Sequence, residues 1–210
     1  MSLTLRILGR RPSINVRKVL WTLDEVGRAY ALEVWEPSPS PERTIELQAL
    51  NPNVQFPVLI EASKPLWESN TICRYVVGEA GRSDLLPTDP WARADVERWM
   101  DWQATDLNDA WRYAFLALLR KKVGYDDPTT IQASIRAWNA KMAILDAHLA
   151  MTGSFAAGGR FSLADIGLGL SVHRWLGTPM ERPDLGNVAA YYERLKTRPH
   201  FLTHANEALI

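Results

Sequence analysis

The chain has 210 residues, of which 47% are hydrophobic and 23% are charged, so it can bury a sizeable core and is not an intrinsically disordered chain. Basic and acidic side chains both number 24 and balance in each half of the chain, which argues against a nucleic-acid partner. The single cysteine, Cys73, excludes an internal disulfide, a cysteine-rich zinc site and a C-x-x-C redox pair, and it favours a reducing compartment.

The N-terminal residues 1–6 alternate apolar and polar side chains. They lack the long apolar run of a signal peptide or of a membrane span. We therefore expect a cytoplasmic protein without a membrane partner.

The first 80 residues alternate strand and helix patterns. Period-2 alternation marks strands, helical spacing of apolar residues marks helices, and glycine and proline separate them. The expected order is β-α-β-α-β-β-α, with the last two strands antiparallel. In chain order, the pattern predicts elements over residues 3–7, from an N-cap at Ser13 or Asn15 up to residue 27, and over 30–35, 42–50, 57–61, 66–68 and from about 69, the last burying Ile72, Tyr75 and Val76.

After residue 81 the apolar spacing is helical throughout, so we expect an all-α second part. The predicted division is an α/β domain over 1–81, a linker over 82–90 and an all-helical domain over 91–210. The expected helices cover about 91–122, 128–152, a segment opening at 163, 185–196, and 199 to the end. Ser162 and Asp165 have the spacing of a capping box at the start of the third, which is a structural role.

Ser13 lies at the start of the first helix, where unpaired backbone N–H groups and a partial positive charge favour an anion. A thiolate is such an anion, and lowering a thiol pKa by roughly two units requires about 2.7 kcal/mol of preferential stabilisation. One charge-assisted hydrogen bond and the helix terminus could supply it. Cys73 is distant in sequence, so the thiol would belong to a ligand. Alternatively, Ser13 is an ordinary N-cap.

Two further sites have both functional and structural interpretations. In Gln55-Phe56-Pro57 a cis peptide bond would turn the Phe56 backbone groups outward to pair with a peptide ligand, but the residues alone do not decide between cis and trans. Glu68 and Ser69, at a strand end and a helix start, could hold the ammonium and carboxylate of one amino acid. Alternatively, they only cap the helix.

Side chains of mixed character share one face of the first long helix, namely Asn108, Trp111, Arg112 and Phe115, and could floor an apolar pocket or belong to the core. A basic cluster near the first turn (Arg10, Arg11, Arg17, Lys18) could steer an anion or form a solvated face. The four histidines lack metal-ligand spacing, and nucleotide-binding and serine-hydrolase motifs are missing, so we expect no metal.

Four segments combine these features: Arg11-Pro-Ser13-Ile-Asn15-Val-Arg-Lys-Val19, Leu50-Asn-Pro-Asn-Val-Gln55-Phe-Pro57-Val-Leu59, Trp67-Glu-Ser-Asn-Thr-Ile72 and Phe161-Ser-Leu-Ala-Asp-Ile166. In order and spacing, over essentially the whole chain, they resemble the cytosolic glutathione transferases, in particular serine-type and related bacterial members. The resemblance implies a thioredoxin-like N-terminal domain, an all-helical C-terminal domain and a homodimer. Glutathione would be the co-substrate.

Carried over by position, the resemblance implies that Ser13 donates to the glutathione sulfur, with Asn15 as a second polar group. Pro57 would be a cis-proline, with the Phe56 backbone on the cysteinyl unit and Gln55 nearby. Glu68 and Ser69 would anchor the γ-glutamyl group. Phe56 departs from the pattern, because many relatives carry a small aliphatic residue there.

The implied function is activation of glutathione as a thiolate that attacks an apolar electrophile, as in detoxifying enzymes. One alternative is a glutathione-dependent disulfide reductase or peroxidase using the same site. Another is a non-catalytic binding protein of this fold. Cysteine-type chemistry is not expected, since the first turn carries no cysteine and Cys73 falls within a helix.

Overall fold

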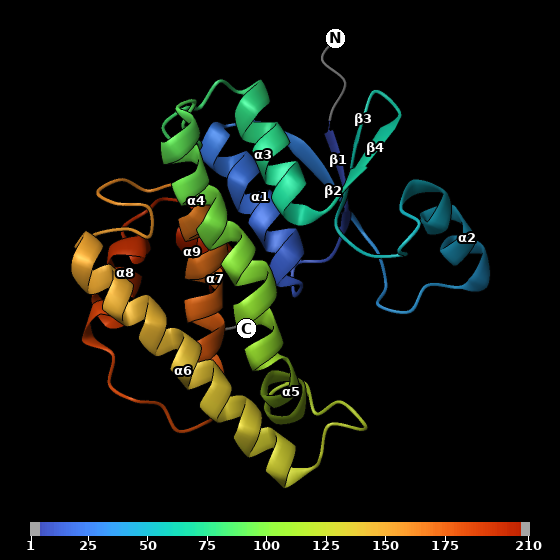
Figure 1. Cartoon of the computed structure of the whole chain (residues 1–210). Coiled ribbons are helices and arrows are strands. Elements are labelled where there is room, and N and C mark those ends of the chain that lie inside the picture. The colour runs from blue at the N-terminus through green and yellow to red at the C-terminus, as the bar shows by residue number, and fades with distance from the viewer. Residues whose placement is uncertain (1–4, 207–210) are drawn as a thin grey trace.

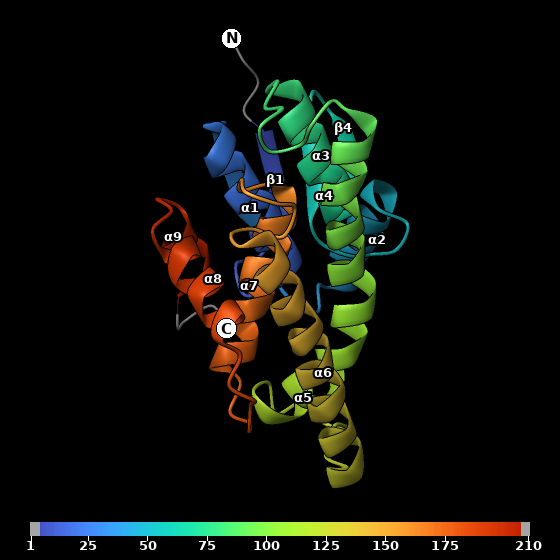
Figure 2. The same cartoon turned by 60° about the vertical axis from the view of Figure 1, so that its left-hand side comes forward.

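The computed structural model describes residues 5–206, in which a small mixed sheet is followed by a stack of helices (Figures 1 and 2). The sheet order is β2-β1-β3-β4. Strand β1 runs parallel to β2 and antiparallel to β3, and β3 and β4 are antiparallel, as predicted. The strands are β1 (Leu5–Gly9), β2 (Tyr30–Val34), β3 (Val58–Glu61) and β4 (Lys64–Trp67).

The expected β-α-β-α-β-β-α order and the helical second part are confirmed. The first strand was predicted over 3–7. Residues 3 and 4 lie outside the described residues, and the strand extends to Gly9 because Leu8 and Gly9 still pair with β2. The β3–β4 hairpin turns through Ala62 and Ser63, both with positive φ, which suits a two-residue turn.

Helices cover both faces of the sheet: α1 (Ile14–Val26) and α3 (Ser69–Glu79) on one, α2 (Pro41–Leu50) on the other. Strand alternation explains this arrangement, since Leu5 and Ile7 join the core of α1 and α3, whereas Leu8 packs with Trp35 under α2. Within α3, Tyr75 is half-buried rather than buried, because its hydroxyl bonds the Glu61 carboxylate at the sheet edge.

Helix α1 lies between the sheet and the helical part of the molecule (Figure 1). It begins at the N-cap Ser13 and ends at Gly27, whose φ of 69° forms a left-handed C-cap. Its side chains are buried on nearly every face, including the charged Arg17 and Lys18. Burial of two cations in one helix indicates that α1 belongs to the cores of both parts.

The remaining helices stack beside α1 and α3 (Figure 2). They are α4 (Pro90–Trp102), α5 (Asn108–Leu118), α6 (Pro128–Thr152), α7 (Leu163–Gly177), α8 (Gly186–Lys196) and α9 (Phe201–His204). Helix α7 is buried along most of its length and is the axis of this layer. No helix among residues 5–206 is both long and apolar enough to cross a membrane.

The predicted helix over 91–122 is wrong in two respects. A π-helical turn, Gln103–Leu107, separates α4 from α5, because the fully buried Gln103 side chain bonds groups on three other segments. The helix also ends at Leu118 rather than at residue 122. The Arg120 amide bonds the Phe115 carbonyl, and Lys121 takes a φ of 49°, which turns the chain away.

The last helix was predicted from 199 to the end but, within the described residues, it covers only Phe201–His204. It is short because its polar groups bond α1 instead of continuing a helix. Arg17 donates to the His204 carbonyl over 2.7 Å, and the His204 ring bonds Asp24 over 2.6 Å. Residues 207–210 of this prediction lie outside the described residues.

The segment between α3 and α4 is packed against the rest of the protein. Leu85 and Leu86 are buried, and the Leu163 amide donates to the Leu85 carbonyl over 3.0 Å. The division into domains at 82–90 stays a prediction, since it concerns how the two parts fold.

Cys73 is buried, and its sulfur accepts from the Thr22 hydroxyl over 3.2 Å. Burial raises the pKa of this thiol.

The capping box at the start of α7 is confirmed. Asp165 is fully buried, and its carboxylate accepts from the Ala156 and Ser162 amides at 2.9 and 2.8 Å. The Tyr191 hydroxyl adds a third bond of 3.0 Å. One side chain therefore joins the start of α7 to the preceding loop and to α8.

We predict that Asp165→Ala lowers the free energy of unfolding by about 3 kcal/mol, because it leaves several buried donors without a partner. Urea unfolding followed by circular dichroism measures this loss. Asp109→Ala is the matched control, since Asp109 is exposed on α5 and should change stability by less than about 0.5 kcal/mol. Equal stability of the two variants would contradict the structural role.

Candidate active site

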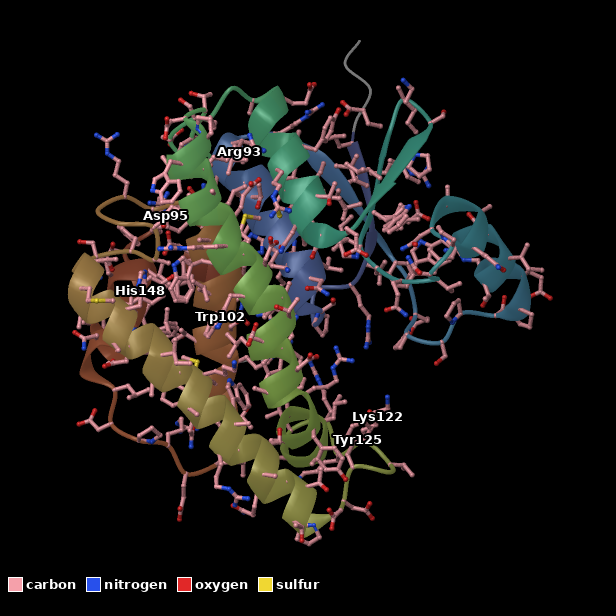
Figure 3. All side chains as sticks on the ribbon, viewed as in Figure 1. Arg93, Asp95, Trp102, Lys122, Tyr125 and His148 are labelled. Atoms are coloured by element: carbon pink, nitrogen blue, oxygen red, sulfur yellow. The ribbon has the colours of Figure 1, made fainter. Side chains whose placement is uncertain are left out.

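A cavity of about 420 Å³ opens between the N-terminus of α1 and helix α5. Three predicted residues from the sheet-containing part line it, Ser13, Asn15 and Gln55. The four predicted residues of α5 line the opposite side: Asn108, Trp111, Arg112 and Phe115. Two sets of residues chosen for separate reasons therefore face one cavity. The loop after α5 completes the wall with Lys122 and Tyr125, both labelled in Figure 3.

Ser13 lines this cavity, and its side chain caps α1. Its oxygen accepts from the Val16 amide over 3.5 Å, which is long for a hydrogen bond. A cap uses the oxygen as an acceptor and leaves the O–H proton to be donated elsewhere. The structural and the functional interpretations of Ser13 are therefore compatible in one conformation.

The first turn of α1 supplies further donors beside Ser13. The amides of Ile14 and Asn15 precede the first intrahelical bond, which the Arg17 amide makes to the Ser13 carbonyl over 3.0 Å. The Asn15 side chain is half-buried and bonds no described residue. Hydroxyl, amide side chain and helix terminus thus converge where an anion would be stabilised.

The Phe56–Pro57 peptide bond is cis. The preceding turn is held by Asn51, whose side chain donates to the Gln55 carbonyl over 2.9 Å. Phe56 packs against Trp35, and its Cβ lies 3.5 Å from where a Cβ on Gly9 would be. This close approach brings Phe56 beside the turn that carries Ser13, although neither Phe56 nor Pro57 lines the cavity itself.

Glu68 and Ser69 lie at the start of α3, outside the lining of the cavity. Glu68 is exposed, has a φ of 68° and makes no side-chain cap, whereas Ser69 is buried. The Glu68 side chain therefore does not cap α3. The negative charge of Glu68 instead acts to raise the pKa of Lys18 in α1, against the larger effect of burial.

Sequence reasoning missed a buried polar network behind the cavity. Lys18 donates to Asn70 over 3.0 Å and to Gln103 over 3.3 Å. The Gln103 amide donates to Asn108 over 3.1 Å, and Asn108 accepts from the Trp111 indole over 2.9 Å. The π-helical turn thereby connects α1 to the aromatic wall. A buried glutamine in an apolar stripe was the only available sequence signal.

Arg174 of α7 is the second residue that sequence reasoning missed. Its side chain is 3% exposed, lines the cavity and stacks on the Trp111 and Phe115 rings at 4.4 and 4.1 Å. Burial lowers the pKa of Arg174 well below its usual value, and Arg17 and Arg120 add repulsion. An arginine in an otherwise apolar helix was the sequence signal.

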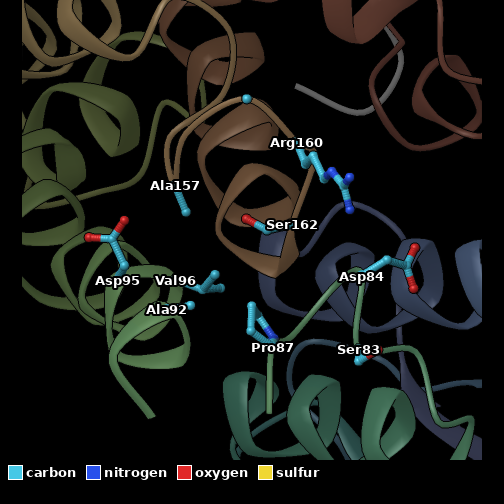
Figure 4. A pocket seen from close by; sticks show the side chains of 10 residues that line it. Ser83, Asp84, Pro87, Ala92, Asp95, Val96, Ala157, Arg160 and Ser162 are labelled. Atoms are coloured by element: carbon cyan, nitrogen blue, oxygen red, sulfur yellow. The ribbon is translucent and has the colours of Figure 1, made fainter. Parts of the chain in front are cut away.

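Other hollows contain none of the predicted site residues. One of about 530 Å³ lies between the segment before α4 and the loop before α7, where Pro87, Val96 and Ser162 face one another (Figure 4). A smaller one, near Trp102 and His148, lies between α4 and α6 (Figure 3). Within residues 5–206, no cluster of histidine, cysteine and carboxylate side chains has the arrangement of a metal site.

Residues 3–78 match the family model of the glutathione S-transferase N-terminal domain. The chain is 33% identical over 193 residues to glutathione S-transferase GstB of Escherichia coli, covering 91% of this chain and 92% of the relative. It is 27% identical over 205 residues to glutathione S-transferase 3 of Zea mays, covering 94% and 91%.

Among solved structures, the chain is similar to a theta class glutathione S-transferase from Xanthomonas axonopodis with glutathione bound. The TM-score is 0.90 at 36% identity, and the match covers 99% of each chain. The similarity therefore extends over both the sheet-containing and the helical parts.

The Lys18 network generates a prediction about pH. Burial lowers the pKa of Lys18 from 10.5 to about 8, against the attraction of Cys73 and Glu68. Between these two values the unfolded chain holds the Lys18 proton and the folded chain does not, so folding stability rises with pH. Below about pH 8 both states are protonated and the dependence ends.

We predict that the free energy of unfolding of the wild type, minus that of Lys18→Met, rises by about 1 to 2 kcal/mol between about pH 7.5 and pH 9.5. Urea titrations at several pH values measure the difference, in which the contributions of other groups cancel. The same comparison with Lys64→Met, an exposed lysine of β4, should show no such rise. A difference that falls with pH would refute the buried, easily deprotonated Lys18.

Proposed function

The chain belongs to the glutathione S-transferase family, and from this premise we propose that Ser13 activates bound glutathione as a thiolate. It is a glutathione transferase. The observation that carries the proposal is the position of Ser13, which lines the cavity while its hydroxyl oxygen accepts from the Val16 amide and keeps its own proton to donate. Asn15 and the first-turn amides of α1 add to the stabilisation of the sulfur anion.

The tripeptide would lie along the edge formed by the starts of α1, β3 and α3. The Phe56 backbone, directly before Pro57, pairs with the cysteinyl unit. Gln55 lies at the rim of the cavity. Glu68 and Ser69 hold the γ-glutamyl group, with the Glu68 carboxylate accepting from its ammonium. Fixing the ligand at several points orients the sulfur toward Ser13.

The reaction is a substitution or addition at an electrophilic carbon. The thiolate sulfur forms a bond to that carbon, and a leaving group, where there is one, departs with its electron pair. The co-substrate rests against α5, where Trp111 and Phe115 supply apolar surface and Asn108 and Arg112 supply polar groups. Detoxification of reactive small molecules in the cytoplasm is the role we propose for this chemistry.

The two alternative functions lack a supporting observation. A glutathione-dependent disulfide reductase or peroxidase on the same site would rely on Asn15 and backbone amides more than on Ser13, and Cys73, buried against Thr22 with a raised pKa, offers it no second thiol. A non-catalytic protein has no use for a hydroxyl and an amide side chain directed at one cavity, yet Ser13 and Asn15 both line it. Conjugation is therefore the function that the site supports best.

We predict that Ser13→Ala raises the pKa of bound glutathione by about 1 to 2 units and lowers kcat roughly 10- to 100-fold, because one charge-assisted hydrogen bond to the thiolate is lost. Thiolate absorbance in the ultraviolet, titrated against pH with glutathione bound, measures the shift. Asn15→Ala tests the second polar group in the same way.

Ser40→Ala is the matched control for the loss of a cap. Ser40 caps α2 with a similar bond, 3.4 Å to the Arg43 amide, and is exposed away from the cavity. It should leave the thiol pKa unchanged. A bound-thiol pKa in Ser13→Ala that stays as low as in the wild type would transfer the activating role to Asn15 and the helix terminus, and an unshifted pKa in the wild type would refute thiolate activation.

We also propose that the chain acts as a homodimer. The family premise supports this, as do the free edge of β4 and an adjoining hollow with Leu66 and Tyr75 in its lining. Light scattering after size-exclusion chromatography should give about twice the 23.7 kDa of one chain. A mass of one chain at micromolar concentration would contradict the proposal.

A further inference from the structure

Arg174 carries a charge that the described part of the protein does not balance. The side chain is 3% exposed, no acidic group accompanies it, and its Nε has no hydrogen-bond partner within residues 5–206. Unpaired buried charges are unfavourable and are rarely retained without a role. Contacts with the Trp111 and Phe115 rings offset only part of the lost hydration.

The surroundings of Arg174 are positive throughout. Among residues 5–206, five cationic residues and no aspartate or glutamate line the cavity; the cations are Arg10, Arg112, Arg120, Lys122 and Arg174. Arg120 donates to the Pro12 carbonyl over 3.3 Å, directly before Ser13. Repulsion from Arg17 and Arg120 adds to burial in lowering the pKa of Arg174. The walls are thus apolar and aromatic, but the electrostatic potential within the cavity favours an anion.

We propose that Arg174 is a specificity-determining residue that binds an anionic group on the electrophilic co-substrate, so that the preferred co-substrates combine an apolar body with a carboxylate or similar oxyanion. This inference rests on the proposed function, because the anion is placed beside the thiol that Ser13 activates. Trp111 and Phe115 hold the apolar body, and the guanidinium donates to the oxyanion.

The orientation of the Arg174 guanidinium is fixed before any ligand binds. The Trp111 indole donates to Asn108, which accepts also from Gln103, so the ring beneath the guanidinium is fixed by the network that includes Lys18. An anion entering the cavity would find its cationic partner already dehydrated and oriented. Such preorganisation adds affinity, since little reorganisation accompanies binding.

Two aryl chlorides of nearly the same shape, one with a negative charge and one neutral, test this proposal. 4-Chloro-3-nitrobenzoate and 4-chloro-3-nitrobenzamide have nearly the same size and react at the same carbon, where the glutathione sulfur bonds and chloride leaves with its electron pair. Each enzymatic kcat/KM is divided by the rate constant of the uncatalysed reaction with glutathione, which removes the difference in intrinsic reactivity. The quantity compared is the ratio of benzoate to benzamide.

We expect Arg174→Met to lower this ratio roughly 10- to 100-fold, mostly through the KM of the benzoate, with the benzamide and the KM of glutathione little changed. Arg174→Lys should retain part of the preference. Arg136→Met removes an exposed charge on α6 and should leave the ratio unchanged. An unchanged ratio in Arg174→Met, or an equal fall for both compounds, would overturn the proposal while leaving the transferase function standing.

Stability provides an independent readout. Because Arg174→Met removes an uncompensated buried charge, its thermal unfolding temperature should equal or exceed that of the wild type. A purely structural arginine would instead give a large decrease. If the methionine variant does not fold, Arg174→Gln replaces it, since it also removes the charge and keeps a polar side chain of similar length.

Direct binding distinguishes failure of this inference from failure of the proposed function. With S-methylglutathione saturating the peptide site, calorimetry should detect benzoate binding to the wild type at least about 10-fold tighter than to Arg174→Met, and no such difference for benzamide. This result would support the anion site even if neither chloride were turned over. Equal benzoate binding to both proteins, or no binding to the wild type, would overturn it.

Discussion

The structure depends above all on the burial of α1 between the sheet and the helical layer. A helix exposed on one side would carry its charged residues there, but in α1 both Arg17 and Lys18 are buried and bond groups from distant parts of the chain. The helix therefore cannot shift relative to either layer without breaking those bonds. Since Ser13 caps this helix, the position of its hydroxyl is fixed by the packing of both layers rather than by its own loop.

Much of the fold could be predicted because it follows from local patterns. Apolar alternation and glycine or proline breaks locate the strands, and the spacing of Ser162 and Asp165 is enough to predict the start of α7. The stripe on α5 was also predicted, since residues three and four apart share a helix face. Ser13 was singled out by its place at a helix start and Gln55 by the segment before Pro57, whereas Asn15 came from the family pattern. All three line the same cavity as that stripe.

The features that escaped prediction depend on contacts between distant segments. The π-helical turn requires the pairing of Gln103 with Lys18 and Ser171, which no local periodicity reveals. The stacking of Arg174 on Trp111 and Phe115, with no acidic partner within residues 5–206, is visible only when α7 and α5 are packed together. The end of α5 also escaped prediction. Two consecutive lysines suit the C-terminus of a helix and suggested an end at residue 122, whereas the positive φ of Lys121 turns the chain away after α5 has ended.

The π-helical turn has a consequence for how this site could change. Its wider winding absorbs one extra residue, and each residue turns an α-helix by about 100°. Deleting a single residue such as Ala104 would let the segment wind as an ordinary α-helix, with the Trp111 face of α5 still toward the cavity. The bond between Gln103 and Asn108 spans five residues, the spacing of a π-helical turn, and is the contact that such a deletion would change. The extra residue therefore serves the buried network rather than the choice of helix face that lines the cavity.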